Sequence, residues 1–292
     1  MSEIEVKDVT MCYGKHCALE NISITIEPDK IYGLLGKNGA GKTTLLNLIT
    51  NKLFPSSGEI TVDGEGVREN DNALEKIYYM TEKDYCPENM RVKEVFRWTK
   101  EFYPNFSIEY ATELCKKFDL NQNKKLKELS TGYGTIAKLI TSLASNSPII
   151  IFDEPVLGLD ATHRDLFYKE LLVNYMEHPK TIILSTHIIE EIAKILERVI
   201  IIKDRNVLIN DDTENLLKSA YCVSGLAENI DRYISGKKCI NIEHMASYKS
   251  ATIYEKITDA DRDNAKSLNL EFSKVELQNM FIYLTSTGGM NQ

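Results

Sequence analysis

The chain has 292 residues, of which 43% are hydrophobic and 27% charged, as is ordinary for a globular protein. This length suffices for one large domain and one smaller domain. The formal net charge of −8 argues against a general nucleic-acid binder. No apolar run approaches the ~18 residues that a membrane-spanning helix needs, so the chain alone is not expected to cross a membrane.

The N-terminal segment MSEIEVKDVT contains no apolar stretch of the kind found in a secretory signal. The six cysteines stand at positions 12, 17, 86, 115, 222 and 239, and no two of them form a C-x-x-C motif. This arrangement predicts reduced thiols in a cytosolic protein.

The first predicted elements are strands. Apolar residues alternate with polar ones between residues 3 and 27, beginning with Ile4 and Val6, and this period is typical of half-buried antiparallel strands. A third strand is expected in GEITVDG at 58–64. Between these segments, the run IYGLL at 31–35 has no alternation, which indicates a strand buried on both faces.

A glycine-rich loop follows that buried strand. Residues 33–44 read GLLGKNGAGKTT and contain the spacing G-x-x-x-x-G-K-[ST] from Gly36 to Thr43. Glycines let a ligand approach the main chain, and the helix predicted in KTTLLNLIT directs its N-terminus at a phosphate. In this motif Lys42 contacts the β- and γ-phosphates and the Thr43 hydroxyl binds Mg²⁺. The predicted nucleotide contacts are Asn38, Gly39, Ala40, Gly41, Lys42, Thr43 and Thr44.

Helices are predicted from about 88 to 145, where Tyr110, Leu114 and Phe118 recur every four residues. Continuous apolar runs return at 149–152, 181–186 and 199–202, as expected for a parallel sheet. A further short segment begins at about residue 215.

Two carboxylates stand where one of the buried strands ends, in PIIIFDEP. Ligands bind at the carboxyl ends of strands in open α/β sheets. Asp153 is therefore predicted to hold Mg²⁺ through water, and Glu154 to polarise the water that attacks the γ-phosphate. Strand-end carboxylates also cap helices or face solvent, so this prediction depends on the phosphate loop upstream.

Four segments in this order, LLGKNGAGKTT, ELSTGYGT, IIIFDEPVLGLD and ILSTHIIEE, resemble the nucleotide-binding subunits of ABC transporters. The resemblance covers residues 2 to about 212. Within that family, the short form with a C-terminal extension resembles exporters of peptides, lantibiotics and related amphipathic compounds. The resemblance implies a head-to-tail dimer that encloses ATP between the loop at 36–44 of one subunit and the signature segment of the other.

The resemblance also assigns roles to single residues. Tyr13 matches the aromatic residue that stacks on adenine, and Glu82 stands where many relatives carry a glutamine that contacts Mg²⁺. Asp160 matches a loop that crosses the dimer interface, and His187 matches the switch histidine that holds the attacking water. Ser130 and Gly132 match the signature loop that faces the partner's γ-phosphate.

The signature segment departs from the family pattern Leu-Ser-Gly-Gly-Gln, because Thr131 replaces a glycine and Tyr133 replaces the glutamine. A Cβ at position 131 should narrow the approach of the backbone to phosphate. We expect the isolated subunit to dimerise weakly with ATP for this reason.

These observations predict an α/β fold, a P-loop NTPase of the ABC ATPase type. Its parts are a RecA-like parallel-sheet core, an antiparallel β subdomain, an α-helical subdomain at about 85–145 and a small C-terminal extension. The ATPase domain is expected to cover residues 1–214, and residues 215–292 to regulate or stabilise the dimer. The predicted function is ATP hydrolysis, with ATP and Mg²⁺ as cofactors, to drive the export of peptides or amphipathic toxins.

The expected partners are a separate transmembrane permease and a second ATPase subunit, identical or different, with no nucleic acid. The expected location is the cytoplasm, on the inner face of the cell membrane. An ABC-type ATPase that acts on DNA or the ribosome is the alternative. It is less favoured because the chain lacks a long coiled-coil insertion and has only one cassette. A P-loop kinase or GTPase is a further alternative. It is disfavoured because such an enzyme would lack Ser130-x-Gly132 and the pair Thr186–His187.

Overall fold

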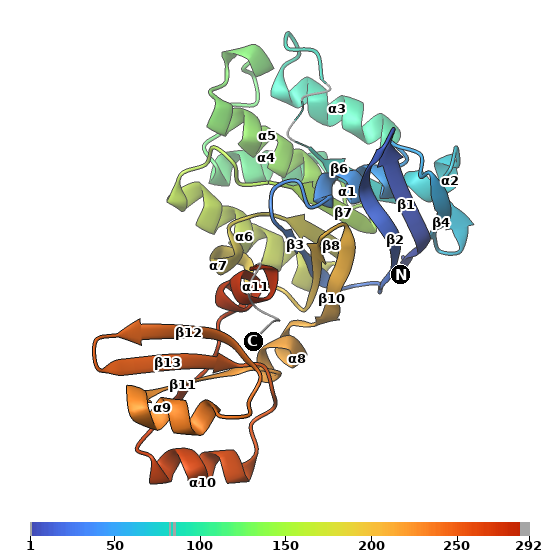
Figure 1. Ribbon diagram of the computed structural model, residues 1–292. Helices are drawn as coiled ribbons and strands as arrows, with labels where there is room; N and C mark the ends of the chain where they lie inside the picture. The colour runs from blue at the N-terminus through green and yellow to red at the C-terminus, as the bar shows by residue number, and fades with distance from the viewer. Residues whose placement is uncertain (1, 82, 84–85, 287–292) are drawn as a thin grey trace. The chain divides into compact units, whose positions relative to one another are not determined.

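The computed structural model describes residues 2–81, 83 and 86–286 (Figure 1). The chain divides into two compact units. The larger unit contains the residues up to His187 together with Ile202–Ile209. The smaller unit contains Ile188–Ile201 and the residues from Asn210 onward.

An antiparallel sheet opens the larger unit, with the strand order β2-β1-β4-β5. Its strands are β1 (Ile4–Tyr13), β2 (His16–Ile26), β4 (Ser57–Val62) and β5 (Glu65–Gly66). The period-two pattern predicted this sheet, and the step from Val6 to Val9 coincides with a shift in the pairing register. Asp8 adopts a left-handed backbone (φ 50°) inside this irregularity, which returns Val9 to the buried face.

The second sheet has the strand order β10-β9-β3-β8-β7-β6. Its strands are β3 (Ile31–Gly36), β6 (Ile77–Met80), β7 (Ile149–Asp153), β8 (Thr181–Ser185), β9 (Arg198–Lys203) and β10 (Asn206–Asp212). The pairs β3–β8, β8–β7 and β7–β6 are parallel. β3, β7 and β8 are buried along their whole length, which explains their continuous apolar sequences.

Helices cover the parallel strands of the larger unit. α1 (Lys42–Ile49) packs against both β2 and β3, so it joins the two sheets, and α5 (Thr131–Ala144) packs against β6. The ring of Phe167 in α6 (Ala161–Glu177) contacts the ring of Phe152 in β7, whereas α2 (Asp71–Leu74) packs against β4 of the antiparallel sheet.

The predicted helical region contains three α-helices that pack against one another, as Figure 1 shows in green. They are α3 (Val92–Phe102), α4 (Ile108–Lys117) and α5 (Thr131–Ala144), with a 3-10 turn η1 at Leu126–Glu128. Each α-helix begins at a residue with extended backbone, and the Ser107 hydroxyl accepts the Tyr110 N–H to cap α4.

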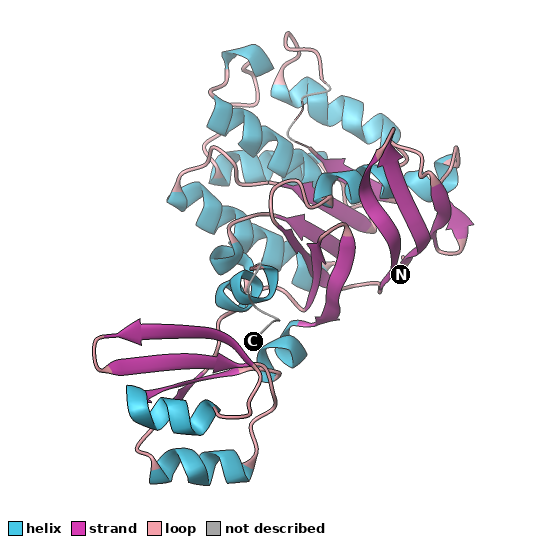
Figure 2. Ribbon diagram, in the orientation of Figure 1, coloured by secondary structure: helices cyan, strands magenta, loops and turns pink. Residues whose placement is uncertain are grey.

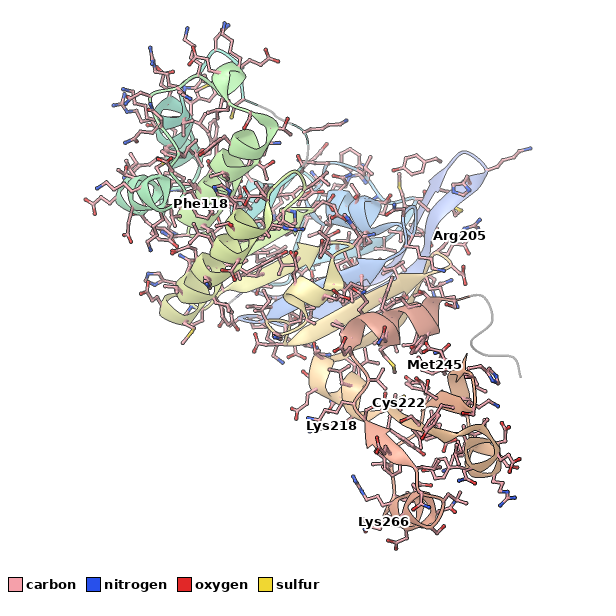
Figure 3. The ribbon with its side chains drawn as sticks, turned by 90° about the vertical axis from the view of Figure 1, so that its left-hand side faces the viewer. Phe118, Arg205, Lys218, Cys222, Met245 and Lys266 are labelled. Atoms are coloured by element: carbon pink, nitrogen blue, oxygen red, sulfur yellow. A yellow bond between two sulfur atoms is a disulfide. The ribbon has the colours of Figure 1, made fainter. Side chains whose placement is uncertain are left out.

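The smaller unit has a four-stranded antiparallel sheet of its own, in the order β12-β13-β11-β14 (Figure 2). Its elements are α7 (Ile189–Ile192), α8 (Thr213–Lys218), β11 (Tyr221–Leu226), α9 (Ala227–Ile234), β12 (Cys239–Met245), β13 (Tyr248–Ile253), α10 (Asp259–Ser267), β14 (Glu271–Ser273) and α11 (Leu277–Thr285). Val223, Ile230 and Ile253 are fully buried in its core. Figure 3 labels Cys222 on β11, Met245 at the end of β12 and Lys266 on α10.

One expectation about the cysteines is wrong. Cys12 and Cys17 form a disulfide across the β1–β2 hairpin, whereas Cys86, Cys115, Cys222 and Cys239 are thiols that take part in no disulfide in the described residues. Their separation of five positions in the sequence does not predict a disulfide between Cys12 and Cys17, because only the register of the hairpin brings these two side chains face to face. Separately, no helix in the described ranges is both long and apolar enough to cross a membrane.

Candidate nucleotide site

The glycine-rich loop connects β3 to α1, and two of its glycines are required by packing. A Cβ on Gly36 would lie 3.0 Å from the carbonyl oxygen of Ile202. A Cβ on Gly41 would lie 2.6 Å from Leu19 Cδ2 and 2.9 Å from the carbonyl oxygen of Ala18, and Gly41 also has φ 107°. A larger residue is therefore excluded at Gly41 and fits only tightly at Gly36, and the main chain of the loop stays open to a ligand.

Lys42 is the first residue of α1 and is buried. Its ammonium donates hydrogen bonds to the carbonyl oxygens of Gly36 at 2.7 Å and of Lys37 at 3.4 Å. Burial lowers the pKa of Lys42, while the charges of Glu154 and Asp153 act in the opposite direction. The loop thus folds around a cation, as a site for a polyanionic phosphate requires.

Thr43 and Asp153 meet at the end of β7. The Thr43 hydroxyl donates to Asp153 Oδ2 at 2.9 Å, and the Tyr79 hydroxyl donates to the same oxygen at 3.3 Å. A hydroxyl and a carboxylate are hard oxygen ligands of the type that Mg²⁺ prefers. Within the described residues no cluster of three or more His, Cys, Asp or Glu could hold a metal.

Tyr79 was not predicted. It lies near the end of β6, a strand parallel to β7, and the Lys52 ammonium lies 4.5 Å from the centre of its ring. Knowledge that β6 and β7 are neighbours could have suggested Tyr79, since the carboxyl ends of neighbouring parallel strands meet at one edge of the sheet.

Glu154 lies beside the end of the neighbouring strand β8. Its N–H donates to the carbonyl oxygen of Ser185 at 2.8 Å, and its backbone is left-handed with φ 50°. Its Oε2 accepts from the Thr186 hydroxyl at 3.3 Å and lies 2.9 Å from His187 Nδ1. Left-handed backbone is uncommon for glutamate. The structure therefore brings Glu154 and His187 together, although they are 33 residues apart.

Tyr13 lies at the tip of the β1–β2 hairpin and is 51% exposed. The strand after this tip carries Ala18 and Leu19, the two residues against which Gly41 packs. The hairpin tip and the phosphate loop therefore belong to adjoining parts of the larger unit.

The remaining residues of the phosphate loop are accessible: Asn38 and Gly39 are exposed, and Ala40 and Thr44 are half-buried.

The signature residues lie at the start of α5. The Ser130 hydroxyl accepts the Tyr133 N–H at 3.3 Å and caps the helix. A Cβ on Gly132 would lie 3.2 Å from the carbonyl oxygen of Gly158, so a larger residue there would fit only tightly. Thr131, which replaces a glycine of the family pattern, is exposed in the first turn.

Asp160 caps α6 in the same way, because it accepts the His163 N–H at 2.9 Å. Ser130, Gly132 and Asp160 make no hydrogen bond to Lys42, Asp153 or Glu154 in the described part of this chain. Glu82, the predicted additional metal contact, lies outside the described residues. The roles of all these residues remain predictions.

The fold and the loop geometry define a P-loop NTPase with a parallel-sheet core. Residues 19–157 match the family model described as ABC transporter. The chain is 31% identical over 228 residues to the ABC transporter ATP-binding protein YtrB of Bacillus subtilis (strain 168), covering 78% of each chain. It is 32% identical over 209 residues to the ATP-binding protein NatA of the same organism, covering 69% of this chain and 85% of NatA.

A solved structure of the ATP-binding cassette MJ0796, a dimer in a post-hydrolysis state bound to ADP and Pi, is also similar. The TM-score is 0.63 at 26% identity, and the match covers 72% of this chain and 98% of that one. The chain belongs to the ATP-binding subunits of ABC transporters. It binds ATP and is an ATPase.

Proposed function

We propose that this subunit hydrolyses ATP at the cluster around Glu154 and uses the energy to drive an export permease in a separate chain. The observation that carries the proposal is the convergence of Thr43 on Asp153 at 2.9 Å and of His187 on Glu154 at 2.9 Å. One pair supplies oxygen ligands and the other a carboxylate beside an imidazole.

Each group has one task in this proposal. Lys42 and the N-terminus of α1 bind the phosphates, and Thr43 and Asp153 hold Mg²⁺, with Glu82 as a further contact. When bound, Mg²⁺ neutralises charge on the β- and γ-phosphates. Glu154 accepts a proton from the attacking water, and His187 orients that water and the γ-phosphate. The outcome is positioning together with electrostatic stabilisation, which is how phosphoryl transfer is generally catalysed.

We propose that two subunits close head to tail around ATP. Ser130, Thr131 and Asp160 are accessible at the starts of two helices, where N–H groups favour an anion supplied by a partner. Thr131 adds a Cβ at this surface and should weaken closure. Thr131→Gly in a Glu154→Gln background should therefore increase the dimer fraction with Mg-ATP in sedimentation. Tight dimerisation of the Thr131 form, with no effect of glycine, would refute this account.

The permease is proposed to dock on the helical region, at the inner face of the cell membrane. A cavity of about 410 Å³ lies between the end of β6 and helices α3 and α5. Val92, Val95 and Ala137 give it apolar walls, and Glu88 and Lys138 add charges. A groove of this kind suits an amphipathic segment of another chain. The C-terminal extension, residues 215–292, is proposed to stabilise or regulate the dimer.

The proposed cargo is a peptide or another amphipathic compound. Support comes from relatives named as export proteins, such as the Nod factor export ATP-binding protein I of Rhizobium etli, which is 30% identical over 209 residues. The test is to sequence the neighbouring genes for a membrane protein and to co-express that protein with this chain. ATPase activity should rise, because a permease that holds two subunits raises their effective concentration. In vesicles that contain the complex, an amphipathic peptide should then move across the membrane away from the side that holds ATP. Movement toward the side that holds ATP would refute export.

A further inference from the structure

The disulfide between Cys12 and Cys17 closes the tip of the β1–β2 hairpin. Cys12 pairs with Cys17, the next pair is Tyr13 with His16, and the turn between them is Gly14–Lys15. Both cysteines are half-buried, so small thiols and disulfides can reach them.

A bulge separates this tip from the rest of the hairpin. The register passes from Met11–Leu19 to Cys12–Cys17, so β2 contributes one residue more than β1 between these two pairs. Beyond such a bulge only two residue pairs remain, and a ladder this short is marginal in water. The Cys12 N–H also donates to the Ser56 hydroxyl at 3.1 Å. The disulfide is therefore the main restraint that could fix the tip.

The residue that this restraint would position is Tyr13. It stands directly after Cys12 and is 51% exposed, so packing against the protein holds little of its ring. Just after Cys17, the segment of Ala18 and Leu19 lies against Gly41 of the phosphate loop. The disulfide thus links the loosely held ring of Tyr13 to a segment that is packed against the phosphate loop.

We propose that Cys12 and Cys17 form a reversible thiol–disulfide site that sets the affinity for ATP through the position of Tyr13. The inference rests on the proposed stacking of Tyr13 on adenine. In the oxidised form the tip is fixed and Tyr13 is ready to receive the base. In the reduced form the tip frays, and part of the population cannot stack.

The chemistry is thiol–disulfide exchange with a small-molecule disulfide. The thiolate of one cysteine attacks that disulfide, which forms a mixed disulfide and releases one small thiolate. The second cysteine thiolate then attacks the protein sulfur of the mixed disulfide and releases the second small thiolate. The two protein thiols are oxidised by two electrons, the small disulfide is reduced to two thiols, and the two protons pass to these thiols. A small thiol reverses the sequence.

The test is calorimetric titration of the full-length Glu154→Gln chain with ATP, which binds without turnover. One sample is treated with oxidised glutathione and the other with a phosphine reductant, and mass spectrometry after alkylation reports the state of Cys12 and Cys17. Reduction should raise the Kd for ATP roughly three- to tenfold, as expected when a third to a tenth of the population is competent. Cys12→Ser should behave as the reduced form in both samples. Cys222→Ser, a half-buried cysteine of the smaller unit (Figure 3), should respond to reduction as the parent does.

Two further titrations separate this inference from the proposal on which it rests. Inorganic triphosphate has no base, so its affinity should not change on reduction. Tyr13→Ala should weaken ATP binding and abolish the redox effect. If Tyr13→Ala binds ATP like the parent, the stacking role is wrong. If Tyr13→Ala weakens binding but reduction of the parent has no effect, or if Cys12 and Cys17 are alkylated after oxidation, the redox inference is wrong.

Discussion

Replacing Glu154 by glutamine removes a negative charge and changes little else in the larger unit. The glutamine side chain has the same length, and its carbonyl oxygen can still accept the Thr186 hydroxyl, which lies 3.3 Å from Glu154 Oε2. What is lost is the ability to take a proton from water. A positioned general base contributes about 10²–10⁴ in rate, so turnover should fall by that factor. The Kd for ATP should change little, because Lys42 and the loop are intact.

The assay combines single-turnover hydrolysis of ATP with calorimetric titration. Glu69→Gln is a matched control, because Glu69 is exposed and has a similar left-handed backbone, with φ 51° against 50° for Glu154. Glu69→Gln should hydrolyse ATP at the parental rate. Hydrolysis by Glu154→Gln within a factor of two or so of the parent would refute the general-base role, since a base should contribute ~10² or more.

Three other predictions follow from the geometry. Lys42→Ala should raise the Kd for ATP by roughly ten- to a hundredfold, because hydrogen bonds to charged groups are worth about 1.5–3 kcal/mol; unchanged calorimetric affinity would contradict the loop assignment. Gly41→Ala should weaken ATP binding far more than Gly39→Ala: both positions have positive φ, but a Cβ at Gly41 meets the backbone oxygen of Ala18 at 2.9 Å whereas one at Gly39 meets nothing within 4 Å; equal affinities would show that packing behind the loop is unimportant. Burial lowers the pKa of Lys180 to about 8 from 10.5. The unfolded chain then binds more protons between about pH 8 and 10.5, so this residue should increase the free energy of unfolding as pH rises through that range, by at most about 3 kcal/mol. Urea unfolding should show that Lys180→Met lacks this rise, and identical pH profiles would refute it.

The local structure of the glycine-rich loop could be predicted from sequence. The spacing from Gly36 to Thr43 specifies a turn, a cation and a helix start within eight residues. The runs at β3, β7 and β8 were recognised as buried strands because they lack alternation. These signals lie within one segment each, so no knowledge of strand order was needed.

The contacts between segments required the tertiary structure. Thr43 and Asp153 are 110 residues apart, and Tyr79 reaches the same carboxylate from a third strand. Their meeting depends on which parallel strands are neighbours, and hydrophobic periodicity does not encode that order. The four-stranded sheet of the smaller unit was missed for a related reason, since its short strands have mixed burial and exposed ends.

The cysteines show the same division most clearly. Sequence spacing alone predicted that Cys12 and Cys17 are reduced, because the six cysteines are spread along the chain and form no C-x-x-C motif. The register of the hairpin decided otherwise, since a bulge after Met11 places the two residues opposite each other. The sequence by itself identified the glycine-rich loop and the strand-end carboxylates as candidates for nucleotide chemistry. Only the tertiary structure determined which of them meet, because pairing between strands depends on register and order rather than on residue type.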